Sequence, residues 1–377
     1  MKVFIRADAS TQIGTGHVMR CLTLAGDLKL LGMEVSFISR VLPGDLCDYV
    51  ESKGFKVYRL NTVENRDGDY WEWLTENWLE DARKTQEILL NQVTDRADIT
   101  NININEERSG LNKTFTDPAD TTNISSRIAA ELFSAAGSSS KAGLSLNLVV
   151  DSYALDSKWE KYQRPYVGKL MVLDDLADRP HDCDLLLDQN YYRNMDRRYE
   201  GLVSSACKML LGPQYALLRP EFHQAKKDLR KRDGKIRRIL VFFGGSDPTN
   251  ETKKALEAIK LLNRPEIAVD VVVGAANPHQ EEIKYICSEM PNTTFQYQVE
   301  NMAELMAAAD LAIGAGGATT WERLYLELPT IAIAVAENQV ETLEALGKEG
   351  VVWYIGKSVG VNQEDLYRKI RVLIKEN

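Results

Sequence analysis

The sequence predicts two doubly wound α/β domains, and three observations lead to this fold class. Apolar runs of strand length alternate with longer helical patterns over most of the chain, the runs are continuous in Val, Ile and Leu, and the chain is 377 residues long. Continuous apolar strands separated by helices indicate parallel sheets that helices cover on both faces. A single hydrophobic core stops growing at about 250–300 residues, so this length predicts two domains.

Eight apolar runs are the clearest strands, and helical patterns lie between them. The runs are residues 3–8, 35–39, 146–151, 169–175, 238–245, 269–274, 310–317 and 330–336, and two of the helical patterns are 18–32 and 252–263. The two series of runs divide near residues 211–222. We therefore predict Rossmann-like domains at residues 1–212 and 213–377 with a cleft between them, and ligands that bind outside the carboxyl ends of the strands.

One segment, from about residue 91 to 146, interrupts the alternation. It is rich in Asn, Thr, Ser, Asp and Gly and shows little periodicity beyond a possible short helix at 126–136. This composition is typical of a partly flexible insertion on the surface of the first domain. It is either a mobile decoration or a lid or oligomer contact.

The composition argues against a nucleic-acid partner and against a membrane span. The net charge is −9, and acidic residues interrupt the longest basic run, 226–238, which fits a solvated helix and linker better than a nucleic-acid surface. The chain shows no signal peptide and no run of 18 apolar residues, so we expect a cytoplasmic protein without a membrane span. Its five cysteines are scattered and fit reduced core thiols. We expect a monomer or a weak homodimer.

The first candidate site is the stretch IGTGHVMRC, which follows the strand at residues 3–8. Gly14 and Gly16 permit positive φ and a close approach of a ligand, and the helix that begins near His17 presents N–H groups suited to phosphate. The third glycine of the dinucleotide fingerprint is absent, because Met19 stands in its place. His17 is either a polar residue at a helix start or a base, and the convergence of strand end, glycines and helix favours the base.

A second glycine loop follows the strand at 310–314. Gly316 and Gly317 precede Thr319, which opens a helix containing Glu322. The loop suits a phosphate, and Glu322 could accept hydrogen bonds from two ribose hydroxyls or be an acid favoured by the helix dipole. Asn338 follows the strand at 330–336 and is expected near the same sheet edge.

A third strand–glycine–helix stretch is FFGGSDPTN at residues 242–250. Gly245 and Ser246 are candidates for contact with a diphosphate or sugar, although Ser246 and Asp247 could equally cap the helix. Asp174, Asp175 and Asp178 suggest a metal, but no ligand set of suitable spacing surrounds them. We therefore predict no metal site.

The order of these motifs resembles the family of sugar-nucleotide hydrolases of the pseudaminic acid pathway, which includes spore-coat polysaccharide biosynthesis proteins. The matching stretches are residues 6–25, 150–153 (VDSY), 172–179, 183–190, 211–222, 243–250 and 314–323 (GAGGATTWER). They span nearly the whole chain except the insertion, which departs from the compact family pattern. The family is similar in fold to the glycosyltransferase that makes lipid II, so the resemblance implies a GT-B architecture.

The resemblance also implies a reaction. Members release UDP from UDP-2,4-diacetamido-2,4,6-trideoxy-β-L-altropyranose by attack of water at the anomeric carbon, with C–O cleavage and inversion. His17 matches the family's catalytic base, and Tyr153 and Asn338 match positions that contact the sugar. Glu322 matches the uridine-binding glutamate and Arg219 a nucleotide-contacting arginine.

Elementary chemistry is consistent with this reaction without a cofactor. UDP is a good leaving group, glycine-loop N–H groups and helix dipoles can hold its developing charge, and one neutral histidine can deprotonate water. Two other GT-B activities stay open, a UDP-sugar glycosyltransferase and a hydrolysing 2-epimerase. A sugar-nucleotide-binding subunit without activity is the third alternative.

Overall fold

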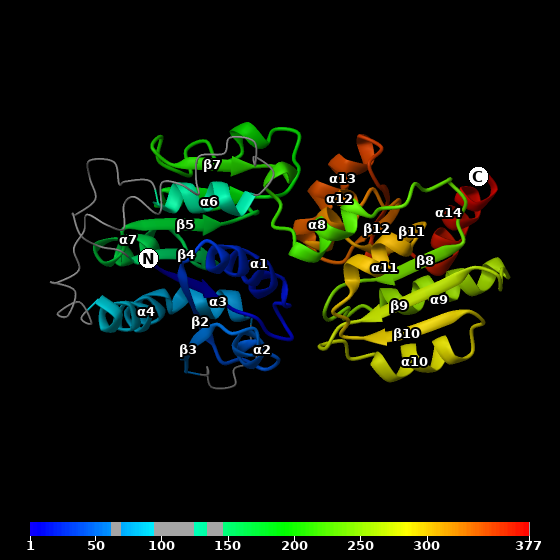
Figure 1. Cartoon of the computed structure of the whole chain (residues 1–377), viewed down its shortest axis with the longest axis horizontal. Helices are drawn as coiled ribbons and strands as arrows, with labels where there is room; N and C mark the ends of the chain where they lie inside the picture. The colour runs from blue at the N-terminus through cyan, green and yellow to red at the C-terminus, as the bar shows by residue number, and fades with distance from the viewer. Residues whose placement is uncertain (62–68, 94–123, 134–145, 377) are drawn as a thin grey trace. The chain divides into compact units, whose positions relative to one another are not determined.

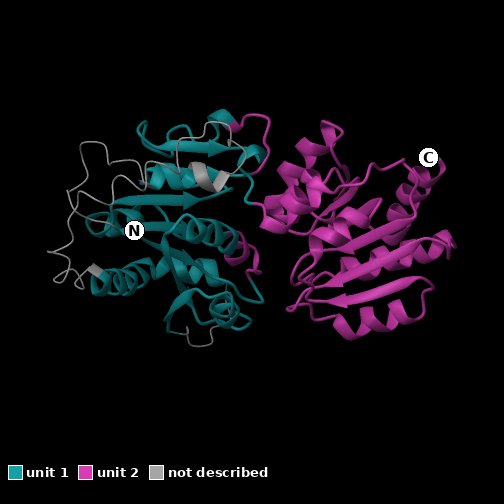
Figure 2. Cartoon of the chain, viewed as in Figure 1, with its two compact units in different colours: residues 1–12, 21–189, 196–217 teal, residues 13–20, 190–195, 218–377 magenta. Residues whose placement is uncertain are grey.

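The computed structural model describes residues 1–61, 69–93, 124–133 and 146–376. The chain divides into two compact units (Figure 2). Unit 1 consists of residues 1–12, 21–189 and 196–217, and unit 2 of residues 13–20, 190–195 and 218–377. The short segment 13–20 therefore groups with unit 2, although β1 before it and most of helix α1 after it belong to unit 1.

Unit 1 is built on a seven-stranded parallel sheet in the order β3-β2-β1-β4-β5-β6-β7 (Figure 1). Its strands are β1 (Lys2–Ala7), β2 (Glu34–Arg40), β3 (Lys56–Leu60), β4 (Leu146–Asp151), β5 (Lys169–Leu173), β6 (Leu185–Asp188) and β7 (Lys208–Leu211). Its helices are α1 (Gly16–Leu30), α2 (Cys47–Ser52), α3 (Tyr70–Glu76), α4 (Trp78–Val93), α6 (Ile124–Phe133) and α7 (Ser157–Gln163). The two central strands, β1 and β4, are buried along nearly their whole length.

Unit 2 has a six-stranded parallel sheet in the order β10-β9-β8-β11-β12-β13. Its strands are β8 (Arg238–Phe242), β9 (Ala268–Val273), β10 (Thr293–Tyr297), β11 (Leu311–Ala315), β12 (Thr330–Ala334) and β13 (Trp353–Lys357). The helices are α8 (Pro220–Lys227), α9 (Glu251–Leu262), α10 (Gln280–Ser288), α11 (Met302–Ala308), α12 (Thr319–Tyr325), α13 (Val340–Lys348) and α14 (Gln363–Glu376). Short 3-10 helices lie in several of the loops, among them η5 (Glu337–Gln339) after β12 and η6 (Ser358–Gly360) after β13.

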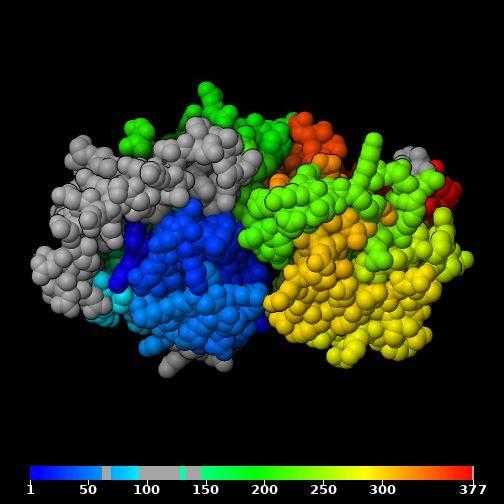
Figure 3. All heavy atoms as spheres, in the orientation of Figure 1, coloured from blue at the N-terminus to red at the C-terminus, as the bar shows by residue number. Residues whose placement is uncertain are grey.

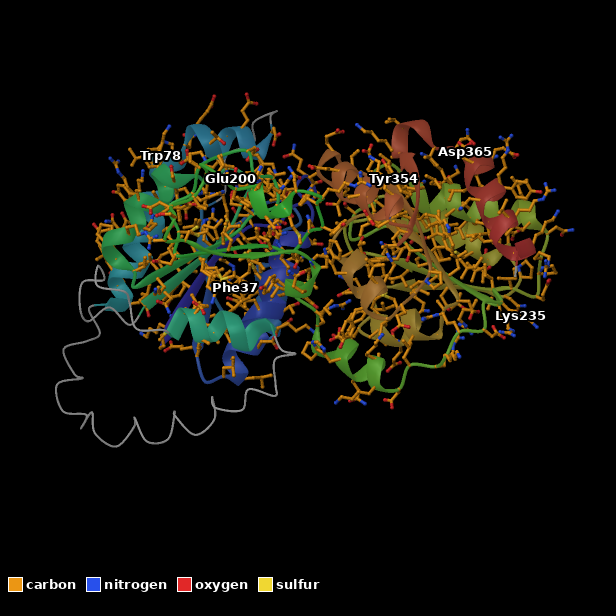
Figure 4. The ribbon with its side chains drawn as sticks, turned by 90° about the horizontal axis from the view of Figure 1, so that it is seen from above. Phe37, Trp78, Glu200, Lys235, Tyr354 and Asp365 are labelled. Carbon is orange, nitrogen blue, oxygen red and sulfur yellow. The ribbon has the colours of Figure 1, made fainter. Side chains whose placement is uncertain are left out.

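The sheet of unit 2 is apolar on both faces because helices cover both. Successive residues of a strand point to opposite faces. Accordingly Ile239 and Val241 pack in a core with α9, α10 and α14, whereas Leu240 between them packs in a second core with α8 and α11. This arrangement explains why the strands read as continuous apolar runs rather than as alternating ones. Phe37 of β2 is fully buried in the same way inside unit 1, and Lys235 lies at the periphery of unit 2 (Figure 4).

A buried group of four charges connects two strands and a helix of unit 1. Arg6 of β1 and Arg40 of β2 each place a guanidinium nitrogen 2.7 Å from Asp81 Oδ2 on α4, and Arg6 lies 2.5 Å from Asp8. All four side chains are at most 2% exposed. Burial acts to raise the pKa of Asp81, but the two guanidinium groups outweigh it and hold that pKa below its usual value. The group carries no net charge, which makes its burial tolerable.

The basic run 226–238 is engaged with unit 2 rather than free in solvent. It begins in α8 and continues across the surface of this unit (bright green in Figure 3). Arg230 pairs with Asp310 at 2.6 Å, and Arg232 donates to the carbonyl oxygens of Met306, Ala309 and Leu326 at 2.8–3.0 Å. Since Met306 and Leu326 lie at or near the ends of α11 and α12, Arg232 satisfies helix carbonyls that have no partner within the helix.

The two doubly wound α/β sheets confirm the predicted fold class, and all eight predicted strands form. Five strands were not predicted: β3, β6, β7, β10 and β13. Four of them, β3, β7, β10 and β13, are edge strands. Edge strands are exposed along much of their length, so they lack the continuous apolar run that marks a central strand.

The predicted insertion at 91–146 lies largely outside the described residues. Within the described part, α4 continues to Val93 and α6 spans Ile124–Phe133. The helix expected at 126–136 is therefore present as far as Phe133. Ile128, Ala129 and Leu132 of α6 are at most 3% exposed, so this helix packs against the core of unit 1, and the surface insertion stays a prediction.

No helix in the described parts of the chain is long and apolar enough to cross a membrane.

We predict that Asp81→Asn destabilises unit 1 by about 3–5 kcal/mol, because it leaves two buried guanidinium groups with a single carboxylate. Asp233→Asn is the matched control, since it breaks the exposed pair of Asp233 with Arg237 and should change little. Hydrogen exchange of the β1 amides in urea reports the stability of unit 1 alone.

The wild type and Asp81→Asn also test how the stability of unit 1 depends on pH. A carboxyl group whose pKa is lowered by folding stabilises the fold above its unfolded pKa of about 3.9, and this contribution is lost as the pH falls through the lower, folded pKa. The advantage of the wild type over Asp81→Asn should therefore be constant near neutral pH and shrink below about pH 4. A constant difference down to pH 2 would contradict the assigned role of Asp81.

Candidate active site

The loop between β1 and α1 has the conformation that its glycines predict. Gly14 has φ +77°, a left-handed value, and α1 begins at Gly16. His17 is the second residue of the helix and is 6% exposed. The loop 8–15 connects it to the carboxyl end of β1, a central strand, and α/β sheets bind ligands outside such ends.

The ring of His17 has a cationic neighbour on its own helix. Nη2 of Arg20, one turn further along α1, lies 3.5 Å from Nδ1 of His17. A guanidinium group donates hydrogen bonds and cannot accept them, so this contact requires an unprotonated Nδ1. In this tautomer the ring proton is on Nε2 and the Nδ1 lone pair faces Arg20, so Nδ1 is the nitrogen that can accept a further proton once this contact opens.

Tyr153, which follows β4, is held by a carboxylate. Its hydroxyl donates to Oδ1 of Asp175, which follows β5, at 2.7 Å, and its ring centre lies 5.6 Å from that of Trp71. Asp175 is 7% exposed. Asp175, which the sequence suggested only as part of a metal site, is instead the acceptor that orients Tyr153.

The other two acids of that stretch also have protein partners. Asp174 lies 2.9 Å from Arg179 and accepts from the hydroxyl of Tyr199 at 3.1 Å, and Asp178 pairs with Arg179 at 2.8 Å. Among the described residues, no group of three or more His, Cys, Asp or Glu side chains is arranged to hold a metal ion.

In unit 2, Glu322 and Arg219 are in direct contact. Nε and Nη2 of Arg219 lie 2.8 and 3.1 Å from the two carboxylate oxygens, a bidentate pair. Glu322 is 7% exposed, and its burial raises its pKa above the usual value although Arg219 opposes this. Arg219 also lies 3.1 Å from Glu221, which is partly exposed. The structure thus brings together two residues that the sequence placed 103 positions apart.

The glycine loop after β11 serves packing as well as ligand access. A Cβ on Gly314 would lie 2.4 Å from the carbonyl oxygen of Phe242, and one on Gly316 would lie 2.6 Å from Leu343 Cδ1. At Gly317 the nearest atom would be 3.9 Å away, which leaves room. Gly314 and Gly316 are therefore required by close packing, and Gly317 is the position open to a ligand.

A glutamine that the sequence analysis passed over holds this loop. Oε1 of Gln339 accepts hydrogen bonds from the backbone N–H of Gly316 at 3.1 Å and of Val335 at 3.0 Å. The N–H of Gly316, expected to face a phosphate, is thus already engaged. Gln339 stands next to Asn338 in η5, and its place in the loop that follows the buried strand β12 was the available signal.

Behind the loop lies a buried arginine, Arg323, which is 2% exposed. Its Nη2 donates to the carbonyl oxygen of Ala315 at 2.5 Å and to Oγ1 of Thr320 at 3.1 Å, and Nη1 donates to Oγ1 of Thr319 at 3.4 Å. Burial lowers the pKa of Arg323 to about 10. The side chain connects the end of β11 to the start of α12 and so fixes where Thr319 lies.

Ser246 and Asp247, in the loop after β8, were predicted either to cap the next helix or to contact a ligand, and the structure shows that Asp247 is a cap. The carboxylate of Asp247 accepts from the N–H groups of Glu251 and Thr252 at 2.9 and 3.0 Å, so Asp247 caps α9. It has φ +41°, a value unusual for a residue other than glycine. Gly245 and Ser246 are half-buried, and their predicted contact with a ligand stays a prediction.

Comparison with known proteins shows which family the C-terminal part of the chain is similar to. Residues 239–377 match the model of the glycosyltransferase family 28 C-terminal domain. This match covers the sheet of unit 2, including Glu322, Gln339 and the two glycine loops.

Three relatives extend the similarity into unit 1. An uncharacterized protein of Methanocaldococcus jannaschii, MJ1062, is 24% identical over 90% of this chain. The UDP-2,4-diacetamido-2,4,6-trideoxy-β-L-altropyranose hydrolase of Campylobacter jejuni is 26% identical over 93% of this chain and 97% of its own length. The spore coat polysaccharide biosynthesis protein SpsG of Bacillus subtilis is 32% identical over 47% of this chain. The matches span 57% of MJ1062 and 53% of SpsG, so the chain covers little more than half of these two proteins.

Solved structures identify the fold. MurG of Acinetobacter baumannii has a TM-score of 0.57 at 13% identity, with 99% of this chain and 90% of that chain covered. LpCGTa, solved in complex with UDP, has a TM-score of 0.57 at 11% identity over 99% of this chain and 90% of that chain. The chain therefore has the GT-B fold, as predicted, and identities this low carry no statement beyond the fold.

We predict that Gln339→Ala speeds hydrogen exchange of the Gly316 and Val335 amides about 3–10-fold, because each loses its acceptor and a neutral hydrogen bond contributes about 1 kcal/mol. Gln339→Glu keeps an acceptor oxygen and should leave exchange near the wild-type rate. Equal exchange in wild type and Gln339→Ala would show that another group holds the loop.

Proposed function

We propose that this protein hydrolyses UDP-2,4-diacetamido-2,4,6-trideoxy-β-L-altropyranose to UDP and the free sugar, in the synthesis of a pseudaminic acid or related surface polysaccharide. The observation that carries the proposal is His17, a buried imidazole at the start of α1, the helix that follows β1 through the loop 8–15. The similarity to the Campylobacter hydrolase over 97% of that protein's length supports the choice of substrate.

In this proposal unit 2 binds the nucleotide. Glu322 accepts hydrogen bonds from the ribose hydroxyls, and Arg219 orients its carboxylate through the bidentate pair. Because Gly316 N–H is engaged by Gln339, Gly317 and Thr319 are the diphosphate contacts of the β11–α12 loop, and Gly245 and Ser246 are those of the β8–α9 loop. Gly316 then acts by letting Leu343 approach the loop rather than by donating to the phosphate.

The reaction is an inverting displacement. His17 removes a proton from a water molecule as the water oxygen attacks the anomeric carbon, and the bond between that carbon and the diphosphate oxygen breaks with its electron pair leaving on UDP. Gly14 and Gly16 leave room around the loop, since a Cβ at either position would meet no atom within 4 Å. Tyr153, oriented by Asp175, and Asn338 contact the sugar. The pair of N–H-rich loops stabilises the charge that develops on the leaving diphosphate.

A glycosyltransferase is the second candidate. The match of residues 239–377 to a glycosyltransferase domain supports it. A transferase would direct the same displacement to an acceptor hydroxyl instead of water. A hydrolysing 2-epimerase and a binding subunit without activity are further outcomes of the experiments below.

We predict that Glu322→Gln weakens UDP binding about 10–100-fold, because an amide has one acceptor oxygen where the carboxylate offers two charged ones. Glu221→Gln is the matched control: Glu221 also touches Arg219, at 3.1 Å, but is 38% exposed and should change the affinity less than about twofold. Isothermal titration with UDP measures both. Unchanged affinity in Glu322→Gln would remove Glu322 from the nucleotide site.

We predict that His17→Asn lowers kcat for UDP release by about 10²–10⁴-fold, the usual contribution of a general base, without weakening UDP binding. His279→Asn is the control, since His279 is partly exposed and its ring contacts the carbonyl oxygen of Pro248, at 3.2 Å from Nε2, rather than any proposed site residue. NMR follows UDP release and the anomeric configuration of the sugar.

Labelled water separates the candidates. Hydrolysis with C–O cleavage places ¹⁸O in the sugar, whereas ¹⁸O in UDP would contradict that assignment. UDP release only on addition of a sugar acceptor would support the transferase, and release of a sugar epimerised at C2 the epimerase. UDP binding without turnover, or a full rate in His17→Asn, would refute the proposed mechanism.

A further inference from the structure

Two thiols of unit 1 lie side by side although they are 24 positions apart in the sequence. The Sγ atoms of Cys183 and Cys207 are 3.5 Å apart, and no disulfide joins them. The other three cysteines, Cys21, Cys47 and Cys287, are buried. The pair plays no part in the proposed nucleotide chemistry, so any role that it has is a separate one.

The backbone holds these two sulfurs together. Cys183 precedes β6 and Cys207 immediately precedes β7, two parallel neighbours in the sheet. Leu185 pairs with Lys208, and the N–H of Lys208 donates to the carbonyl oxygen of Asp184 at 2.9 Å. Both cysteines stand within two residues of this first rung of the ladder, so the ladder keeps their backbones close and the two sulfurs within reach of each other. Rotation of the side chains could bring the sulfurs to the bonding distance of about 2.05 Å.

The two thiols differ in access and in reactivity. Cys183 is 4% exposed, whereas Cys207 is only half-buried and is flanked by exposed Ala206 and Lys208. The thiol of Cys207 has the carbonyl oxygen of Lys208 as an acceptor at 3.7 Å, and its sulfur is also within hydrogen-bond distance of Cys183 Sγ. This hydrogen bond lowers the pKa of Cys207 and raises that of Cys183. Burial instead raises the pKa of Cys47 to about 12 and of Cys287 to about 11.

We propose that Cys183 and Cys207 form a reversible redox site, in which Cys207 first attacks a low-molecular-weight disulfide and Cys183 resolves the mixed disulfide. The Cys207 thiolate attacks one sulfur of the small disulfide, the S–S bond breaks, and one small thiolate leaves. The Cys183 thiol then loses its proton and attacks Cys207 Sγ, which expels the second small thiolate. Two protein thiols are oxidised to one disulfide as one small disulfide is reduced to two thiols.

The bond closes a loop whose side chains support the neighbouring strand ends. Between the two cysteines, the hydroxyl of Tyr199 contacts Asp174 at 3.1 Å and Asp188 at 3.1 Å. Arg198 donates to the carbonyl oxygens of Asp175 and Leu176 at 3.0 and 3.1 Å. A disulfide at the base of this loop removes unfolded-state conformations, so oxidation should stabilise the carboxyl ends of β5 and β6.

The test uses the full-length protein under native conditions with millimolar oxidised glutathione as the probe. Non-reducing peptide mapping of the wild type should show a Cys183–Cys207 crosslink that forms at least about tenfold faster than any modification of Cys287 and that dithiothreitol reverses. The oxidised protein should also unfold several degrees higher than the reduced one.

Single substitutions separate the two roles. Cys183→Ser should trap glutathione on Cys207, because the resolving thiol is absent, and Cys207→Ser should leave Cys183 unmodified. Cys287→Ser is the control and should crosslink at the wild-type rate. Glutathione that remains on Cys207 of the wild type without a crosslink would overturn the proposal, as would modification of Cys287 before Cys207. Because the wild-type map is decisive by itself, a variant that fails to fold does not weaken the test.

Discussion

The parallel pairing of every strand is the constraint on which the candidate site depends. In a parallel sheet all carboxyl ends meet at one edge, and each connection must return along a face of the sheet. The loops after β1 and β4 therefore leave the same edge of the first sheet, although the last residues of these strands, Ala7 and Asp151, are 144 positions apart in the sequence (151 minus 7). The same rule brings the loops after β8, β11 and β12 to one edge of the second sheet. Reaction chemistry can thus be assembled from short segments spread over the whole chain.

Buried charge is the second determinant, and in both units it is neutralised by specific partners. Arg6 and Arg40 share Asp81 in unit 1, and Glu322 is paired with Arg219 in unit 2. Such pairs add little net stability, because the desolvation of two ions offsets most of their attraction. They do specify geometry, since each guanidinium group donates to a carboxylate in only a few orientations. Glu322 is consequently held in one orientation before any ligand arrives.

The glycine loops illustrate how one residue type serves two purposes. Gly14, with positive φ and open space, fits a loop shaped for a ligand, whereas Gly314 and Gly316 are needed because Phe242, Arg323 and Leu343 leave no room for a Cβ. From the sequence alone these glycines are equivalent, because each stands between a strand and a helix. The distinction changes the expected contacts of the β11–α12 loop, where Gly317 and Thr319 take the place of Gly316 as candidate donors to phosphate.

The sequence by itself determined the fold class and all the internal strands except the four-residue β6, because residues buried on both faces of a sheet are apolar without interruption, and that pattern is local. It also indicated which loops carry chemistry, since glycines and a histidine at strand ends are visible in a linear chain. Tertiary structure alone decided the edge strands, whose pattern is diluted by exposure, and the partners of polar groups: Asp175 for Tyr153, Gln339 for Gly316, Asp81 for two arginines and Cys207 for Cys183. These pairings join residues that are distant in sequence, and only the packing of the sheets specifies which side chains meet.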